Sequence, residues 1–145
     1  MPFIRIGGVT RKGTDPDSIS MSASDTKTGA IIQIYFGSDI LADAGFDTPK
    51  CIVAALEGVE EDKGTMLIER ASKGYTLYQQ PNSTTSMLRI PLAKVTHYEV
   101  DPLPGLFTAV QFSMDKQTGV LIALPKWLVY KAKPVAPKLV RGMRV

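Results

Sequence analysis

The chain has 145 residues, the length of one ordinary domain, and its formal net charge at pH 7 is +3. Its content of 44% hydrophobic and 21% charged residues excludes a disordered or low-complexity chain and is typical of a globular protein. No apolar run approaches the roughly 20 residues of a membrane-spanning helix, so we expect no membrane partner.

The first residues of the chain indicate neither an export signal nor a phosphate-binding loop. Residues 1–8 lack the basic start, apolar run and cleavage site of a secretory signal, which predicts a cytoplasmic protein. Glycines and basic residues follow, but a P-loop requires Gly-Lys-Thr at the mouth of a helix, whereas this chain continues into Asp15-Pro16-Asp17. We therefore expect a basic loop at residues 11–14.

Short runs of Val, Ile, Thr and aromatic residues then recur between Gly, Pro, Asn and Asp, as in strands joined by tight turns. This pattern predicts a mainly β fold, such as a small barrel-like sheet. Residues 18–24 alternate between polar and apolar and suit a half-exposed strand, whereas residues 30–36 are denser in apolar side chains and are expected to be buried on both faces. Further strands are predicted at residues 51–57, 65–70, 75–79, 87–90, 95–100, 106–114 and 120–124.

One short helix is predicted at about residues 38–45. Ser38 is expected to cap its first amides, and Gly45 can adopt the left-handed conformation that ends a helix. Asp39 and Asp43 lie four residues apart and share one face, a spacing that also occurs in carboxylate metal sites. Because no histidine is near in the sequence, we interpret both as solvated surface residues and predict no metal site.

Charge and proline content divide the chain into a body and an arm. Residues 1–125 carry 11 basic and 14 acidic residues, whereas residues 126–145 carry six basic residues and no acidic one. The body has an acidic hairpin loop at residues 57–64 and an irregular, proline-containing connection at residues 101–105. We therefore predict a single β-rich domain over residues 1–125 and a basic, extended C-terminal arm over residues 126–145.

The segment from residue 31 to residue 78 contains a strand, a short helix ending at a glycine, and two strands joined by an acidic hairpin. The pieces are Ile32-Gln-Ile-Tyr35, Ser38 to Phe46, Lys50 to Leu56, and Asp62-Lys-Gly64 leading into Met66 to Arg70. This succession resembles the swapped-hairpin family of the AbrB and SpoVT regulators and of antitoxins such as MazE. The resemblance implies a swapped hairpin as the alternative to a barrel-like sheet, and a homodimer, because swapped hairpins complete their sheet with a second chain.

The chain departs from that family where the family reads DNA. AbrB-like DNA binders carry arginines around the first strand and on the short helix, whereas this chain has no arginine between Arg11 and Arg70. Aspartates at positions 39, 43 and 47 would repel phosphate groups. The DNA-reading surface of the family is therefore not expected here.

Two further stretches carry a second resemblance: Phe3-Ile-Arg5 and Gly119-Val-Leu-Ile-Ala-Leu-Pro-Lys-Trp127. With them the whole chain is similar to small uncharacterised open reading frames of tailed phages and prophages. That family has no known activity. The resemblance implies a phage-type protein, which would act in the cytoplasm of its host.

His97 and Cys51 are the only histidine and the only cysteine. They cannot furnish the usual four-ligand zinc site, and no third group is indicated that would orient a Cys-His couple. On the expected strand His97 shares a face with Glu99, so we interpret it as a solvated residue, and Cys51 as a buried thiol. We predict no enzymatic activity and no cofactor.

The arm mixes aromatic and basic side chains, as do proteins that stack the bases of single strands and neutralise their phosphates. The candidate nucleic-acid-binding residues are Lys126, Trp127, Tyr130, Lys131, Lys133, Lys138, Arg141 and Arg144. A weaker mixture of the same kind comprises Arg70, Lys73, Tyr75 and Tyr78. Two other interpretations stay open: that Trp127 closes the core, and that the arm aids solubility or docks on a neighbouring subunit.

From these patterns we expect a non-enzymatic, phage-type accessory protein that binds nucleic acid through its C-terminal arm. We also expect a homo-oligomer, with a dimer as the first expectation. The alternative is a protein-binding module, either an inhibitor of a host complex or a virion or assembly subunit, whose arm docks on a neighbouring chain. Its partner would then be a host or phage protein.

Overall fold

The structure is a computed structural model that describes residues 15–27, 29–81, 83–101, 105–115 and 119–131. The predicted basic loop at residues 11–14 and residues 132–145 of the predicted arm lie outside the described residues, as does most of the 101–105 connection. The elements are β1 (Ile19–Thr26), β2 (Gly29–Phe36), α1 (Ser38–Ala44), β3 (Lys50–Glu57), β4 (Thr65–Arg70), β5 (Tyr75–Gln79), β6 (Ser86–Pro91), β7 (Tyr98–Val100), β8 (Gly105–Val110), β9 (Phe112–Asp115), β10 (Gly119–Ala123) and β11 (Leu128–Tyr130), with short 3₁₀ turns at Glu60–Asp62 and Leu92–Lys94.

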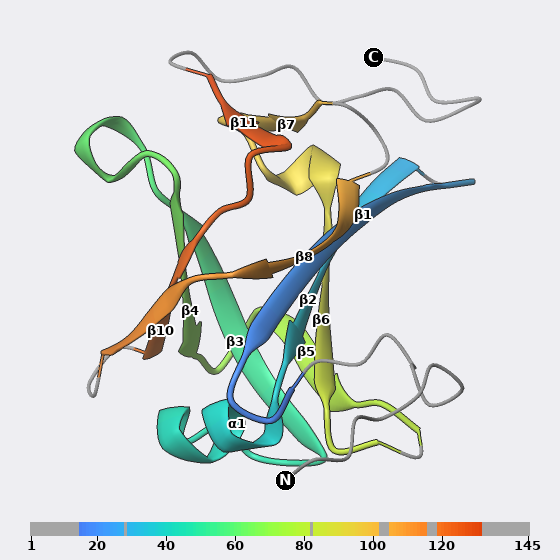
Figure 1. Ribbon diagram of the computed structural model, residues 1–145, viewed down its shortest axis with the longest axis vertical. Helices are drawn as coiled ribbons and strands as arrows, with labels where there is room; N and C mark the ends of the chain where they lie inside the picture. Colours follow the sequence, from blue (N-terminus) through green and yellow to red (C-terminus); the bar gives the residue numbers. More distant parts are fainter. Residues whose placement is uncertain (1–14, 28, 82, 102–104, 116–118, 132–145) are drawn as a thin grey trace, which may run out of the picture.

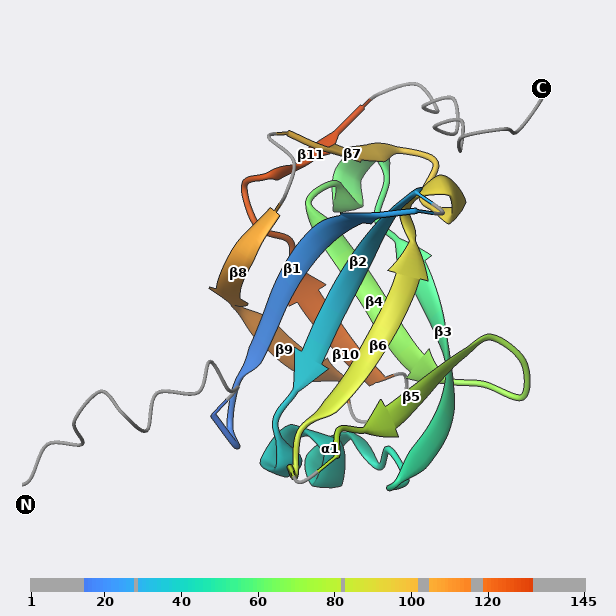
Figure 2. The ribbon, with the colours of Figure 1, turned by 90° about the vertical axis from the view of Figure 1, so that its right-hand side faces the viewer.

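In the described part of the chain, nine strands form one antiparallel sheet that curls into a nearly closed barrel (Figures 1 and 2). The strand order is β8-β1-β2-β6-β5-β3-β4-β10-β9. The edge strands β8 and β9 are consecutive in the chain and are separated only by Gln111, whose carbonyl accepts a 2.8 Å hydrogen bond from the Ala123 N–H. One bent stretch of chain therefore pairs with β1 on one side and β10 on the other, which confirms the predicted barrel-like sheet and splits the strand expected over residues 106–114 in two.

Alternate residues of the strands fill the interior of the barrel. In β2 the buried residues are Ala30, Ile32, Ile34 and Phe36, and the residues between them are half-buried. The prediction that residues 30–36 are buried on both faces is therefore wrong. A sheet that curls on itself has a single interior, so its outward side chains are covered only by their neighbours.

Helix α1 lies at one end of the barrel (Figure 1, bottom), as the sequence predicted, and it ends at Gly45 with a positive φ of 72°. The predicted capping role of Ser38 is wrong, because Gly37 is the N-cap and no side chain caps the helix. The Asp39 N–H instead donates a 2.8 Å hydrogen bond to the carbonyl of Pro16. Neither α1 nor any other helix among the described residues has the length and apolar character needed to span a membrane.

The opposite end of the barrel is covered by a structure that we call the cap, comprising residues 96–100 and 126–131 (Figure 1, top). In it β7 and β11 form a separate two-stranded antiparallel sheet. The strand predicted over residues 95–100 is shorter than expected and begins at Tyr98. Strand β11 was not expected, since its residues were assigned to the arm.

Candidate nucleic-acid interface

The described part of the predicted arm, residues 126–131, is attached to the barrel. Leu128 pairs with Val100 and Tyr130 pairs with Tyr98 in the cap sheet. Beyond the strand, the Lys131 N–H donates a 2.7 Å hydrogen bond to the carbonyl of His97. The chain is therefore held by backbone hydrogen bonds up to Lys131.

Trp127 packs half-buried against the core. Its Nε1–H lies 3.1 Å from both the Leu106 carbonyl and the Thr108 hydroxyl, and can donate to either. A Cβ atom on Gly105 would come within 2.5 Å of the Trp127 ring, so glycine at that position allows the indole to lie against the backbone. This confirms the interpretation that Trp127 closes the core, and it leaves one face of the indole covered.

Tyr130 is also occupied by contacts within the chain. Its hydroxyl accepts a 2.9 Å hydrogen bond from the Glu60 N–H in the loop between β3 and β4. Its ring lies 5.4 Å from that of Tyr98 in an edge-on arrangement, and 6.3 Å from the nearly parallel ring of His97. These contacts fix Tyr130 in the cap.

The basic candidates divide into three groups. The Lys131 Nζ lies 3.1 Å from the Glu99 Oε1, with both side chains partly exposed. Lys126 is exposed in the turn before β11 and has no ion-pair partner among the described residues. The other four candidates lie outside the described residues: Lys133, Lys138, Arg141 and Arg144. Of the residues that the sequence singled out, the structure thus brings 126–131 together at the cap, where mainly Lys126 offers an unpaired charge.

The carboxylate of Glu57, at the end of β3, organises the other half of the cap. It accepts hydrogen bonds from the N–H groups of Thr96 at 2.9 Å and His97 at 2.7 Å, and from the Thr96 hydroxyl at 3.1 Å. The His97 Nδ1 lies 3.5 Å from the Glu57 Oε1. The expectation that His97 is a solvated strand residue is therefore wrong. In a strand the N–H groups of residues 96 and 97 would be free to bond to a neighbouring strand, whereas here they donate to the carboxylate of Glu57.

Tyr98 joins the cap to the acidic loop between β3 and β4. Its hydroxyl donates to the carbonyl of Gly58 and accepts a 2.8 Å hydrogen bond from the Gly64 N–H. The side chain is 1% exposed, and this burial raises the pKa of Tyr98, with the charge of Glu57 raising it further against the lowering effect of the backbone donors. The phenol is therefore neutral at physiological pH and serves as both donor and acceptor.

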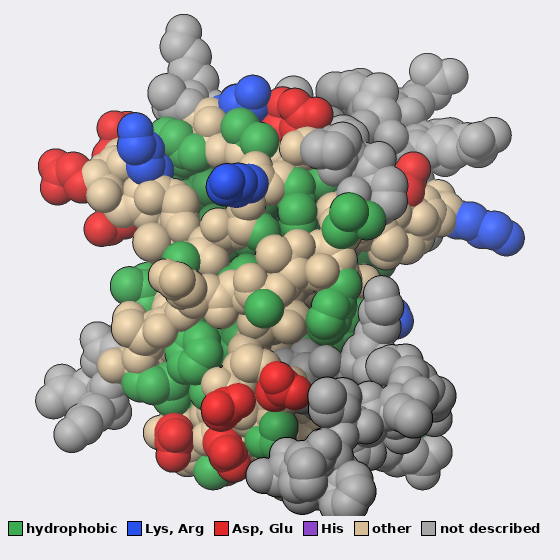
Figure 3. All heavy atoms as spheres, viewed as in Figure 1, with side chains coloured by type: hydrophobic (Ala, Val, Ile, Leu, Met, Phe, Trp, Pro, Cys, Tyr) green, Lys and Arg blue, Asp and Glu red, His purple; other side chains and the backbone are tan. Residues whose placement is uncertain are grey.

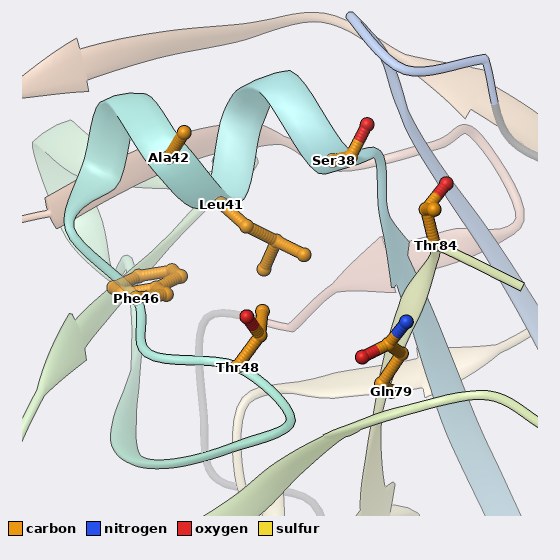
Figure 4. A pocket seen from close by; sticks show the side chains of 7 residues that line it. All are labelled: Ser38, Leu41, Ala42, Phe46, Thr48, Gln79 and Thr84. Atoms are coloured by element: carbon orange, nitrogen blue, oxygen red, sulfur yellow. The ribbon is translucent and has the colours of Figure 1, made fainter.

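A small pocket lies beside α1 (Figure 4). Its volume is about 220 Å³, below the roughly 300 Å³ at which ordinary ligand sites begin. The lining residues are Ser38, Leu41, Ala42, Phe46, Thr48, Gln79 and Thr84, which include no acid, base or thiol. The polar groups that line this pocket are the hydroxyls of Ser38, Thr48 and Thr84 and the amide of Gln79, which can donate or accept hydrogen bonds.

Among the described residues, the side chains that could bind a metal ion or activate a thiol are not brought together. No group of three or more His, Cys, Asp or Glu residues in these ranges could hold a metal ion. Cys51 is buried near the start of β3, whereas Glu57, the partner of His97, ends that strand. Six residues of strand span roughly 20 Å, so the thiol and the imidazole do not form a couple.

A second mixture of aromatic and basic side chains lies on the outer surface of the barrel. Tyr35 on β2 is directly opposite Met87 on β6, which is directly opposite Tyr78 on β5. Lys50 on β3 is in turn opposite Tyr78. The ring of Phe107 on β8 lies 5.4 Å from that of Tyr35. We call Phe107, Tyr35, Met87 and Tyr78 the aromatic row.

The sequence pointed to this surface only through Tyr78. Of the other residues in the weaker mixture, Tyr75 packs against the core, where burial raises its pKa. Arg70 lies 3.4 Å from Asp47, and both side chains are well exposed. Tyr35 was not marked as outward, because residues 30–36 were expected to be buried on both faces, and only the alternating burial along β2 shows its direction. The sequence also carries no signal for which strands are neighbours.

On the face of the molecule shown in Figure 3, acidic side chains gather in two main places. One group lies over α1, where Asp39 and Asp43 are exposed as predicted, and another lies at the loop that contains Glu60–Asp62. The outward positions of β1, β2, β6, β5 and β3 contain no acidic residue. The electrostatic potential is therefore unevenly distributed over the barrel.

Comparison of the chain with protein-family models, with curated proteins and with solved structures finds no match. Evidence on function therefore comes from the sequence, the fold, the cap and the aromatic row.

Proposed function

We propose that this protein is a non-enzymatic, phage-type accessory protein of the cytoplasm that binds nucleic acid through its basic C-terminal arm. The observation that supports the proposal is the division of charge: residues 126–145 carry a net charge of +6, against −3 for residues 1–125. A local concentration of Lys and Arg attracts polyphosphate regardless of the charge of the remaining surface.

The attachment of the arm to the cap supports the same function. Backbone pairing holds the chain as far as Lys131, and four of the six basic residues follow within the next fourteen positions. Trp127 and Tyr130 serve the fold, so the contribution of the arm is charge rather than base stacking. Binding by this arm is consequently expected to depend strongly on salt and weakly on base sequence.

Substitution of the four distal cations tests the proposal in the full-length chain. The variant combines Lys133→Gln, Lys138→Gln, Arg141→Gln and Arg144→Gln. Its affinity for nucleic acid should fall, and the slope of log affinity against log salt should become shallower by roughly 0.7–0.9 for each phosphate that the arm no longer neutralises. Fluorescence anisotropy over a salt series measures both quantities.

A matched control removes the same charge from the body of the protein. It combines Lys12→Gln, Lys27→Gln, Lys63→Gln and Lys94→Gln. The side chains at positions 27, 63 and 94 are exposed. If both variants lose affinity equally, or if the wild type shows a flat salt response, binding through the arm is refuted.

A second candidate function, a protein-binding module, is supported by a different surface. On the outer face of the barrel Leu67 is directly opposite Leu56 on one side and Leu121 on the other. Leu56 is 48% exposed and Leu121 is 39% exposed. Light scattering on the wild type and on Leu121→Asp tests this candidate: loss of an oligomer in the variant supports it, and a monomer in both contradicts it for self-association.

A further inference from the structure

The aromatic row is a continuous apolar strip on the outside of the barrel. Adjacent strands in a sheet lie about 4.8 Å apart, so Tyr35 and Tyr78, on either side of β6, are separated by roughly 10 Å. Met87 lies between them and is only 6% exposed. Tyr78 and Phe107 are 41% and 37% exposed, so the rings retain accessible faces and edges. The row thus presents separate aromatic platforms on one wall.

Two basic side chains lie beside the aromatic row. Lys50 is opposite Tyr78, and Arg89 lies two residues after Met87 on the same outward face of β6. Both side chains belong to exposed residues, and neither has an ion-pair partner among the described residues. The outward positions of β2, β6, β5 and β3 contain no acid, and on the neighbouring strand β4 the outward Glu69 is opposite Ala54, four residues along β3 from Lys50. The wall is therefore complementary to a polyanion that also carries planar apolar groups.

The contrast with the arm identifies the ligand more closely. At the cap the aromatic side chains are engaged in hydrogen bonds and ring contacts, and Lys131 is paired with Glu99. On the wall comparable residue types remain available. Stacking requires bases that are not paired with a second strand, since the faces of duplex bases are covered by their neighbours.

We propose that the wall formed by β2, β6, β5 and β3 binds the unpaired bases of a single-stranded nucleic acid. Tyr78 and Tyr35 stack bases, and Lys50 and Arg89 neutralise the flanking phosphates. This inference rests on the proposed function for the class of ligand, and it adds a second site and a preference for single strands. The arm contributes the sequence-independent charge, and the wall distinguishes unpaired from paired bases.

The test compares a labelled oligothymidylate with a duplex of the same length, using the full-length protein. The expected result is tighter binding of the single strand. Tyr78→Ala should weaken single-strand binding by roughly 5- to 100-fold with a nearly unchanged salt slope, as removal of one stacking side chain does. Tyr78→Phe should retain most of the affinity, because it keeps the ring.

Leu106→Ala is the matched control, since Leu106 is also an exposed large apolar residue, 73% exposed, but lies outside the aromatic row. The double variant Lys50→Gln and Arg89→Gln should lower affinity and reduce the salt slope. If Tyr78→Ala binds the oligothymidylate as well as the wild type does, or if duplex and single strand bind equally, the wall site is refuted while binding through the arm stands. If neither probe binds at low salt, both proposals fail.

A measurement on the unaltered protein guards against variants that misfold. Ultraviolet cross-linking to an oligonucleotide containing 5-bromodeoxyuridine, followed by peptide mass spectrometry, identifies side chains in contact with bases. Cross-links at Tyr35 or Tyr78 support the wall site. Cross-links confined to residues 132–145 overturn it.

Discussion

The cap and the outer wall of the barrel both contain aromatic and basic side chains, but those of the cap are engaged in contacts within the chain and those of the wall are more exposed. At the cap Trp127, Tyr98 and Tyr130 donate or accept hydrogen bonds, and Lys131 is paired with Glu99. On the wall Tyr78 is 41% exposed, and Lys50 and Arg89 have no ion-pair partner among the described residues. A mixture of aromatic and basic residues in a sequence therefore does not reveal whether it serves the fold or a ligand.

The difference follows from the positions of the two regions in the barrel. The cap covers an open end, where strands stop and their last backbone groups need partners, so nearby tyrosine hydroxyls and the Glu57 carboxylate are used for that purpose. The wall is the middle of a sheet, where Tyr35, Met87 and Tyr78 each pair with residues of both neighbouring strands. The outward side chains of the wall are therefore not needed as partners of backbone groups and remain available to a ligand.

The largest effect on stability is expected from Tyr98→Phe. The substitution leaves the Gly58 carbonyl and the Gly64 N–H without their partner in a partly buried site, which should lower the free energy of unfolding by about 2–3 kcal/mol. Urea denaturation measures the change. Tyr130→Phe is the control and should cost about 1 kcal/mol or less, because the Glu60 N–H is exposed to water. An equal loss in the two variants would contradict the role assigned to Tyr98.

A smaller loss is expected from Glu57→Gln. A glutamine keeps the shape, but its NH₂ group faces the N–H donors of Thr96 or His97, and the charge that strengthens these bonds is gone. The free energy of unfolding should fall by about 1–2 kcal/mol. Glu61→Gln, in the exposed loop nearby, should stay within about 0.5 kcal/mol of the wild type. Unchanged stability in Glu57→Gln would show that the cap does not need the carboxylate.

The dependence of stability on alkaline pH tests the burial of Tyr98 and Tyr75 in the unaltered protein. Burial raises the pKa of Tyr98 and of Tyr75 above the ordinary value of 10.0. Above pH 10.0 the unfolded chain therefore releases protons that the folded chain retains, so the free energy of unfolding should fall as pH rises. Urea midpoints measured between neutral and alkaline pH should show this fall, and Tyr98→Phe should flatten it. A level profile in the wild type would contradict the burial of these phenols.

The smallest effect is expected on the wall. Lys50→Gln and Arg89→Gln should each change the free energy of unfolding by no more than about 0.5 kcal/mol, since neither charge has a partner among the described residues. Lys131→Gln, which removes a partly exposed ion pair at the cap, should cost about 0.2–1 kcal/mol. Thermal unfolding of the three variants compares them. A larger loss for Arg89 than for Lys131 would indicate that the wall serves the fold.

Much of the secondary structure could be predicted from local patterns. The strands at residues 65–70 and 75–79 have the predicted bounds, and the helix ends at Gly45 as expected. The exceptions are the strand expected over residues 106–114, which is divided into β8 and β9, and the cap. Strand β11 has three residues and carries no periodicity of its own, and residues 96–97 leave the expected strand because a side chain distant in sequence, Glu57, binds their amides.

The candidate site was predictable in composition but not in geometry. Charge separation is a property of the sequence, and it located the basic segment that begins at Lys126. The sequence offered Trp127 and Tyr130 as ligand-binding candidates, with closure of the core as the other interpretation of Trp127. Their hydrogen-bond partners, Leu106 and Glu60, are 21 and 70 residues away. Partners at such separations depend on the completed fold.

The sequence by itself determined a mainly β chain, the α-helix that ends at Gly45 and the separation of an acidic body from a basic arm, because strand periodicity, a helix-ending glycine and charge are local properties. Only the tertiary structure decided that β8 and β9 close the barrel, that the cap occupies its own aromatics, and that Tyr35, Met87, Tyr78 and Lys50 share one row. The physical reason is cross-strand register: it joins residues from segments far apart in the chain, and it is set by the packing of the whole interior.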